Sequence, residues 1–202
     1  MSKRAIFFDT ETTGTNPHAD RIIELAAYDA DTGKTFERLI NPKIPIPPET
    51  MMVHQISDEM VKDAPTFDEV AKEFCQFCQG DIALIAHNAD GFDTPFLRAE
   101  FKRNGVDFPS EWLFIDSLKW SRRYRKDLPR HSLQFLRQSY GIPANQAHRA
   151  LNDVMVLYEV FKAMTDDLTC EQIATLLHRV SVPELATTEL QKKPVDTVLN
   201  LF

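Results

Sequence analysis

The chain has 202 residues, with 30 acidic against 23 basic side chains and a formal net charge of -7 at pH 7. This length predicts one domain of the usual ~100–200 residues, which can bury a core without disulfides or a structural metal. A composition of 43% hydrophobic and 26% charged residues excludes a disordered chain, a collagen and a coiled coil. The acidic balance argues against a protein that coats duplex DNA through clustered cations.

The sequence predicts neither a membrane segment nor a secretion signal. The first apolar stretch, 5–8, is far shorter than the ~18 residues that a membrane span needs. Three cysteines in the whole chain favour a reducing compartment. We therefore expect a cytoplasmic protein with no membrane contact.

Apolar runs separated by turn residues predict five strands. A turn at 31–34 joins the second strand to the third, and a proline-rich surface connection follows at 41–48. The expected strands are 5–8, 21–30, 35–40, 82–86 and 113–115.

Helices are expected after the third strand and dominate the last third of the chain. Thr66 and Glu69 form a capping box for one helix, and Gly105 ends another. This order of elements predicts an α/β or α+β three-layer fold, and we expect the α/β form with a mixed five-stranded central sheet flanked by helices. The expected helices are a short one from 57, then 66–79, 92–104, 116–125, 131–140, 149–164 and 169–179.

An acidic pair stands directly after the first expected strand. Asp9 and Glu11 are two residues apart, so on a strand they share one face. Neighbouring carboxylates repel unless a cation lies between them, and hard oxygen ligands select Mg²⁺, Mn²⁺ or Ca²⁺. A solvated strand end is the alternative interpretation of such a pair taken alone.

Two further polar groups follow, at 86–93 after the fourth strand and at 148–154 at the start of a long helix. Ligand clefts form at strand ends, but Asp93 could also favour the start of its own helix. On one helix, His148 and Asp153 would lie roughly 140° apart, so they can share a site only if His148 stands in the entry loop. A surface histidine is the alternative.

Together the three groups resemble the motifs of the DnaQ-like, or DEDDh, 3′–5′ exonucleases. The matching blocks are 9–14, 87–93 and 148–153. Within this family the sequence resembles bacterial exodeoxyribonuclease X and the proofreading epsilon subunits of DNA polymerase III. The resemblance implies a ribonuclease-H-like fold with an exonuclease domain over 1–165. The remaining sequence predicts a C-terminal helix packed on or next to this domain over 166–181 and an extended tail over 182–202.

The resemblance also implies two divalent ions, Mg²⁺ or Mn²⁺, about 3.5–4 Å apart. Asp9, Glu11 and Asp153 would hold one ion, and Asp9 would bridge to the second, with Asp93 acting through water. His148 matches the residue that takes a proton from the attacking water, and its reference pKa of about 6.5 suits a base at neutral pH.

Substrate contacts follow from the same resemblance. The backbone after the first strand is expected to contact the terminal nucleotide, and apolar side chains after the proline-rich stretch are expected to border its base. The second motif could touch phosphate or merely support its own loop. The expected substrate-binding residues are Thr10, Thr12, Thr13, Met52, Val53, His54, His87 and Asn88.

A basic segment, 119–131, holds six lysines and arginines against one acid, with Trp120 and Tyr124 interleaved. Such a segment suits the phosphates and bases of a single strand, and a solvated helix face is the equal alternative.

The last five residues resemble the peptide with which bacterial replication proteins bind the sliding clamp, with Val198 in place of the usual glutamine. They could instead cover the protein's own surface or a dimer partner. The expected partner-binding residues are Val198, Leu199, Leu201 and Phe202.

The sequence therefore predicts a two-metal-dependent 3′–5′ exonuclease that releases nucleoside 5′-monophosphates from single-stranded or mismatched DNA 3′ ends, in DNA repair or replication proofreading. An exonuclease that trims RNA 3′ ends is the alternative within the class. A non-catalytic module bound to a polymerase or clamp is the alternative of another class, disfavoured because all four acids and His148 are present.

Overall fold

The computed structural model describes residues 3–143 and 149–168. Its five strands form one mixed sheet in the order β3-β2-β1-β4-β5, which confirms the predicted sheet. Strands β1, β2 and β3 pair antiparallel, while β4 pairs parallel to both β1 and β5. The strands are β1 (Arg4–Thr12), β2 (Ile22–Asp29), β3 (Thr35–Leu39), β4 (Ile82–Ala86) and β5 (Leu113–Asp116).

The central strand β1 is longer than the apolar stretch 5–8 from which it is predicted. Pairing with β2 continues through Asp9 and Glu11, and the register shifts only between Glu11 and Thr12. The two acids therefore lie within the central strand rather than after it. The prediction was wrong in extent because charged residues were taken to end the strand, although backbone pairing does not depend on apolar side chains.

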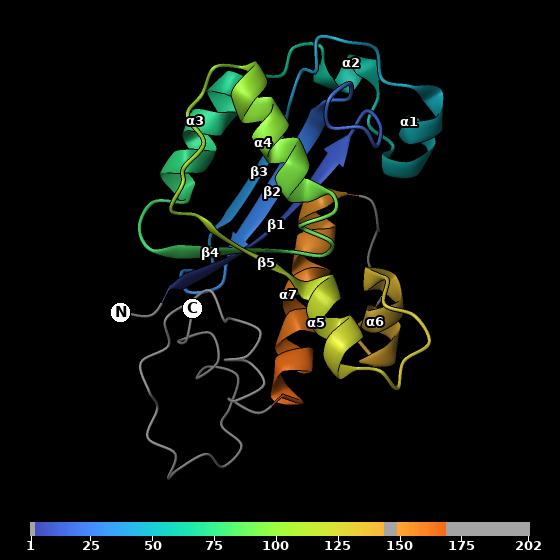
Figure 1. Cartoon of the computed structure of the whole chain (residues 1–202). Helices are drawn as coiled ribbons and strands as arrows, with labels where there is room; N and C mark the ends of the chain where they lie inside the picture. The colour runs from blue at the N-terminus through green and yellow to red at the C-terminus, as the bar shows by residue number, and fades with distance from the viewer. Residues whose placement is uncertain (1–2, 144–148, 169–202) are drawn as a thin grey trace.

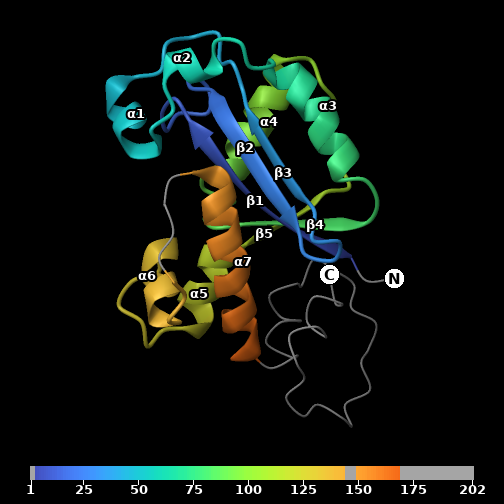
Figure 2. The ribbon, with the colours of Figure 1, turned by 180° about the vertical axis from the view of Figure 1, so that it is seen from behind.

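Helices cover both faces of the sheet, as Figures 1 and 2 show. Side chains of β1 alternate between two cores, since Ile6 and Phe8 pack with α3 and α4 whereas Ala5 and Phe7 pack with α7. This is the predicted three-layer arrangement. The helices are α1 (Pro48–His54), α2 (Asp58–Val61), α3 (Phe67–Phe77), α4 (Asp93–Arg103), α5 (Ser117–Tyr124), α6 (Leu133–Ser139) and α7 (Ala150–Asp166).

Helix α1 was not predicted. It begins at Pro48, the last residue of the proline-rich stretch, because proline fits the first helical position, where no backbone N–H is needed. The capping box of Thr66 and Glu69 is confirmed at the start of α3. The expected helix 169–179 and the tail from 182 lie outside the described residues. No helix in the described part of the chain is both long and apolar enough to cross a membrane.

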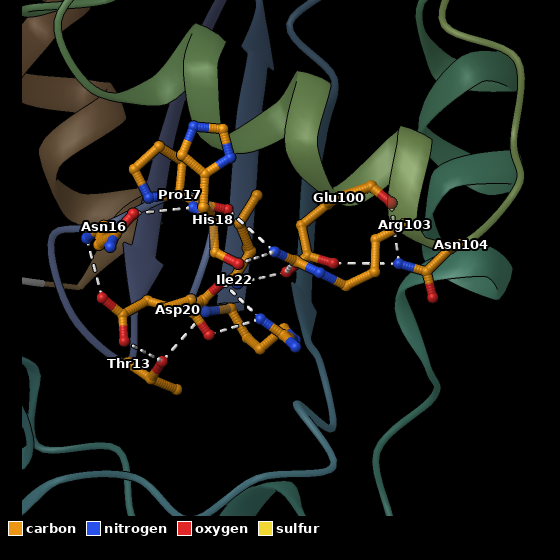
Figure 3. Close-up of polar contacts among 11 residues, drawn as sticks. Thr13, Asn16, Pro17, His18, Asp20, Ile22, Glu100, Arg103 and Asn104 are labelled. Atoms are coloured by element: carbon orange, nitrogen blue, oxygen red, sulfur yellow. Dashed lines mark hydrogen bonds and ion pairs between the residues drawn. The ribbon is translucent and has the colours of Figure 1, made fainter.

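A buried ion pair ties the loop between β1 and β2 to helix α4 (Figure 3). Glu100 is 2% exposed, accepts the backbone N–H of Ile22 at 3.2 Å and pairs with Arg103 at 2.7 Å. Arg103 also donates to the backbone carbonyls of Pro17 and His18, at 2.9 and 3.2 Å. The loop that follows the acidic strand is therefore fixed to the helix that carries Asp93.

Replacing Arg103 with methionine should lower the free energy of unfolding by about 3 kcal/mol or more, because it leaves the buried Glu100 carboxylate without its cation. Chemical denaturation measures the change. Arg38→Met is the matched control, since it breaks the exposed pair with Glu73 and should cost about 1 kcal/mol or less. Equal losses in the two variants would contradict the assigned importance of the buried pair.

Candidate active site

Three carboxylates converge at the end of the central strand. Asp9 and Glu11 project from the face of β1 that packs on α7, and Asp153 projects from the first turn of α7. Each offers one oxygen, and these oxygens lie within 4.8 Å of one another. Sequence spacing predicted the pair on β1, and the packing of α7 adds the third acid.

The fourth predicted acid, Asp93, lies on the wall of the same cavity, whose volume is about 360 Å³. It is the first residue of α4, is 2% exposed, and accepts a hydrogen bond from the Thr10 hydroxyl at 2.8 Å. Thr10 alternates with Asp9 and Glu11 on β1, so it points toward the opposite layer, where α4 lies. Among the described residues, three acids meet at one point and Asp93 stands beside them.

Burial and mutual repulsion make this cluster hold protons. Burial, followed by the charges of Asp93, Glu11 and Asp153, raises the pKa of Asp9 well above its ordinary value. Burial and the charge of Glu24 raise the pKa of Glu11 to about 8. Burial also raises the pKa of Asp93 to about 7, against the lowering effect of its hydrogen bond from Thr10.

The donor set fits a hard divalent cation. Carboxylate oxygens are the ligands that Mg²⁺ and Mn²⁺ prefer, and a cation among them would offset their mutual repulsion. The cavity that these acids line is also lined by Phe92, Ser132 and Leu133 and is open to the surface. The site can therefore accept both an ion and a polar ligand.

Gln134 is a site residue that the sequence did not reveal. Its side-chain amide donates to Asp153 Oδ1 at 3.1 Å, and its own carbonyl accepts from Arg137 Nε at 2.8 Å. The amide is thus held in one orientation by α6 while it contacts an acid of α7. No sequence signal distinguishes this glutamine from other polar residues of α6, because its role depends on how two helices pack.

In the second motif, residues 87–93, the first two residues are hydrogen-bonded to neighbouring segments of the chain. One ring nitrogen of His87 is 2.9 Å from the Ser117 hydroxyl and the other is 2.7 Å from the carbonyl of His131. Burial lowers the pKa of His87. Asn88 has a left-handed backbone, and its N–H donates to the buried carboxylate of Asp116 at 3.1 Å. These contacts favour a role for His87 and Asn88 in supporting their own loop over a role in contacting phosphate.

The expected nucleotide-binding threonines use their side chains locally. The Thr12 hydroxyl donates to the carbonyl of Gly14 at 2.6 Å, and the Thr13 hydroxyl accepts the N–H of Arg21 at 3.0 Å. Both side chains are buried, so backbone groups remain as their means of contacting a substrate.

The expected base-contacting residues lie on α1 and differ in exposure. Met52 is 76% exposed and Val53 is 49% exposed, whereas His54 is buried and its Nδ1 accepts the N–H of Ile56 at 3.0 Å. Apolar contact with a base could therefore come from Met52 and Val53, while His54 organises the end of the helix.

His148 and the four partner-binding residues of the tail lie outside the described residues. The basic segment is described and begins at α5, where Lys119 pairs with Asp90. Arg125 is bound to Asp127 at 2.9 Å and to Asp167 at 3.3 Å. The exposed cations of the segment are Lys119, Arg122, Arg123, Lys126 and Arg130.

Comparison with known proteins agrees with this geometry. Residues 6–161 match the RNase_T family, described as Exonuclease. The chain belongs to this exonuclease family. A DNA polymerase III of PolC type from Staphylococcus aureus is 34% identical over 191 residues, which is 93% of this chain and 13% of that protein. The chain thus spans a small part of that curated relative.

Solved structures share the fold. An exonuclease I structure superposes with a TM-score of 0.77 at 21% identity, covering 88% of this chain and 44% of that one. A zinc-bound complex of Escherichia coli exonuclease I with single-stranded DNA gives 0.69 at 20% identity, covering 89% and 43%. Cell-death related nuclease 4 gives 0.69 at 18% identity, covering 82% and 64%. The family model and the shared fold agree with the resemblance to the DnaQ-like 3′–5′ exonucleases.

Metal binding should release protons from the cluster. With the pKa of Glu11 at about 8 and that of Asp93 at about 7, the metal-free site holds protons at pH 7 that a divalent cation would displace. Affinity for Mg²⁺ should therefore rise from pH 6 to pH 9. Titration calorimetry in two buffers of different ionisation enthalpy measures the protons released.

The same shifts set the stability of the metal-free protein. Because these folded-state pKa values are raised, their contribution to stability is complete below the unfolded pKa of about 4 and is lost as pH rises through 7 to 8. The melting temperature of the metal-free protein should therefore fall between about pH 4 and pH 8, and added Mg²⁺ should restore it. If the heat of Mg²⁺ binding at pH 7 is the same in both buffers, no protons are released, and the prediction that the metal-free cluster is protonated is wrong.

Proposed function

We propose that the protein is a metal-dependent 3′–5′ exonuclease that releases nucleoside 5′-monophosphates from single-stranded or mismatched DNA 3′ ends, in DNA repair or replication proofreading. The observation that carries the proposal is the convergence of Asp9, Glu11 and Asp153 on one point in the lining of a cavity. DNA is favoured as substrate because the PolC-type relative is a DNA polymerase and an exonuclease I of the same fold is known in complex with single-stranded DNA.

Each acid has a distinct part in this proposal. Asp9, Glu11 and Asp153 would hold one divalent cation, Mg²⁺ or Mn²⁺, and Asp9 together with Asp93 would hold a second. The bound ions would activate the attacking water and stabilise the charge on the leaving 3′-oxygen. His148 takes the proton of that water, which is general-base catalysis.

The substrate end is held by groups around the cavity. Backbone groups of the Thr10–Thr13 segment contact the terminal nucleotide, with Thr12 near its 3′-OH. The exposed side chains of Met52 and Val53 give its base an apolar surface. His87 and Asn88 act on the substrate through the loop that they support.

The basic segment would take the phosphates upstream of the 3′ end. The residues that directly follow it, Ser132, Leu133 and Gln134, line the cavity. Its cations lie on a chain that is acidic overall, so they offer a polyanion a local path of favourable charge. Clamp binding by the C-terminal peptide is a separate proposal that rests on the sequence pattern alone.

Turnover of 3′-labelled oligonucleotides with Mg²⁺ or Mn²⁺, compared for DNA and RNA, tests the activity. Wild type should release mononucleotides and should favour DNA. Asp9→Asn and Asp153→Asn should abolish turnover without unfolding the protein, because each substitution relieves repulsion in the cluster. His148→Ala should lose about 10²–10⁴-fold in rate while metal binding persists.

Three results would count against the proposal. Absence of turnover by wild type with either metal would leave the non-catalytic binding module as the better interpretation. Near-normal turnover by Asp9→Asn would move the metal site elsewhere. A clear preference for RNA would favour the RNA-trimming alternative.

The salt dependence of binding tests the basic segment. If Arg122 and Arg123 both contact phosphates, the double change to glutamine should weaken single-strand binding and reduce the slope of log affinity against log salt by about 1.4. Fluorescence anisotropy with a metal-free labelled oligonucleotide measures both quantities. The control is Lys72→Gln with Lys102→Gln, two exposed lysines of α3 and α4 on the other face, which should leave the slope unchanged. Equal slopes for all proteins would favour the solvated helix face.

A further inference from the structure

A further carboxylate, that of Glu24, is buried beside the cluster of Asp9, Glu11 and Asp153. Glu24 lies on β2 directly opposite Glu11 and is 0% exposed. A buried carboxylate is stable only when its oxygens are paired or hydrogen-bonded. Its partners therefore indicate what it holds in place.

Both oxygens of Glu24 are bound by the start of helix α7. Arg149 donates to Oε1 from Nη2 at 2.8 Å and from Nε at 3.2 Å. The backbone N–H of Ala150, the first residue of the helix, donates to Oε2 at 2.8 Å. One side chain of the sheet thus holds a fork-shaped cation and a helix N-terminus together.

This arrangement replaces an ordinary helix cap. Arg149 occupies the N-cap position with an extended backbone and makes no side-chain cap hydrogen bond of its own. Helices normally satisfy their first N–H groups with a local serine, threonine, aspartate or asparagine. Here the acceptor comes from β2, more than a hundred residues earlier, so it fixes the helix relative to the sheet and not only its own first turn.

Asp153 lies within the reach of this anchor. Its backbone N–H donates to the carbonyl of Arg149 at 3.0 Å, so it stands one helical turn from the anchored residue. Any shift or rotation at the start of α7 therefore moves its carboxylate relative to Asp9 and Glu11, which are fixed on β1.

We propose that Glu24 and Arg149 form a positioning pair that sets Asp153 against Asp9 and Glu11 for divalent-cation binding. The inference rests on the proposed metal-dependent function and assigns neither residue as a metal ligand. A local cap would be enough to start the helix, whereas a pair between the strand residue Glu24 and the helix N-cap Arg149 fixes where the helix lies on the sheet. Placing Glu24 beside the cluster has an electrostatic cost. Its charge adds to the effect of burial in raising the pKa of Glu11, and Arg149 offsets part of that rise.

Direct metal binding tests the pair independently of turnover. Calorimetric titration with Mn²⁺ alone should show a dissociation constant raised about 10–100-fold in Glu24→Gln and in Arg149→Met. Arg149→Lys keeps the charge but loses the two-pronged contact, so it should show an intermediate loss. The double variant should lose less than the product of the two single losses, because the residues act as one unit.

A buried acid at the far end of the same strand provides the matched control. Asp29 on β2 is 2% exposed and pairs with Arg4 at 3.4 Å, at the end of the sheet away from the cluster. Asp29→Asn should lower the melting temperature but leave the Mn²⁺ dissociation constant within about twofold of wild type, since additivity is expected for distant sites. The melting temperature of every variant shows whether it is folded.

The outcomes separate this inference from the proposed function. Wild-type Mn²⁺ affinity in Glu24→Gln or in the Arg149 variants would overturn the positioning pair, as would an equal loss in Asp29→Asn. If Glu24→Gln does not fold, Arg149→Lys decides between the same outcomes. A wild-type protein that binds Mn²⁺ without releasing nucleotides would overturn the proposed function and leave the pair in place. Failure of wild type to bind Mn²⁺ would overturn both.

Discussion

The mutual repulsion of carboxylates at the end of β1 is the constraint on which the rest of the site depends. Isolated acids at this spacing would separate or hold protons, and burial together with the neighbouring charges raises the pKa values of Asp9 and Glu11. Hydrogen bonds from neutral side chains hold two of the acids in place. Thr10 fixes Asp93, and Gln134 fixes Asp153. Rigid positioning of this kind keeps metal ligands together before any cation arrives.

Side chains of β1 point alternately to the two helical layers, and this alternation decides which acid each residue of the strand meets. Odd-numbered residues of β1 face α7, so Asp9 and Glu11 meet the acid that α7 supplies. Even-numbered residues face α3 and α4, so Thr10 meets the first residue of α4. A strand at the centre of a sheet is the place where both layers can be reached within three consecutive residues. The cavity therefore opens at the end of β1 and not at a sheet edge.

Sequence alone predicted the parts of this design that are local. The spacing of Asp9 and Glu11 gave their shared face, and short apolar runs gave the five strands. Contacts between distant segments could not be predicted in this way. Gln134 meets Asp153 across two helices, and Glu24 meets Arg149 across 125 residues. Neither glutamine nor glutamate has an unusual sequence context, so only the packed fold assigns them a partner.

The negative charge of the chain has a different meaning once the site is known. A net charge of -7 opposes binding to a polyanion in general, but four acids at one cavity are the groups that a divalent-cation site requires. Two bound cations would change the local charge by about +4, so the cavity would attract the phosphate that the rest of the surface repels. The basic segment concentrates five exposed cations within twelve residues, so a strand end held at the cavity would find favourable charge along that segment.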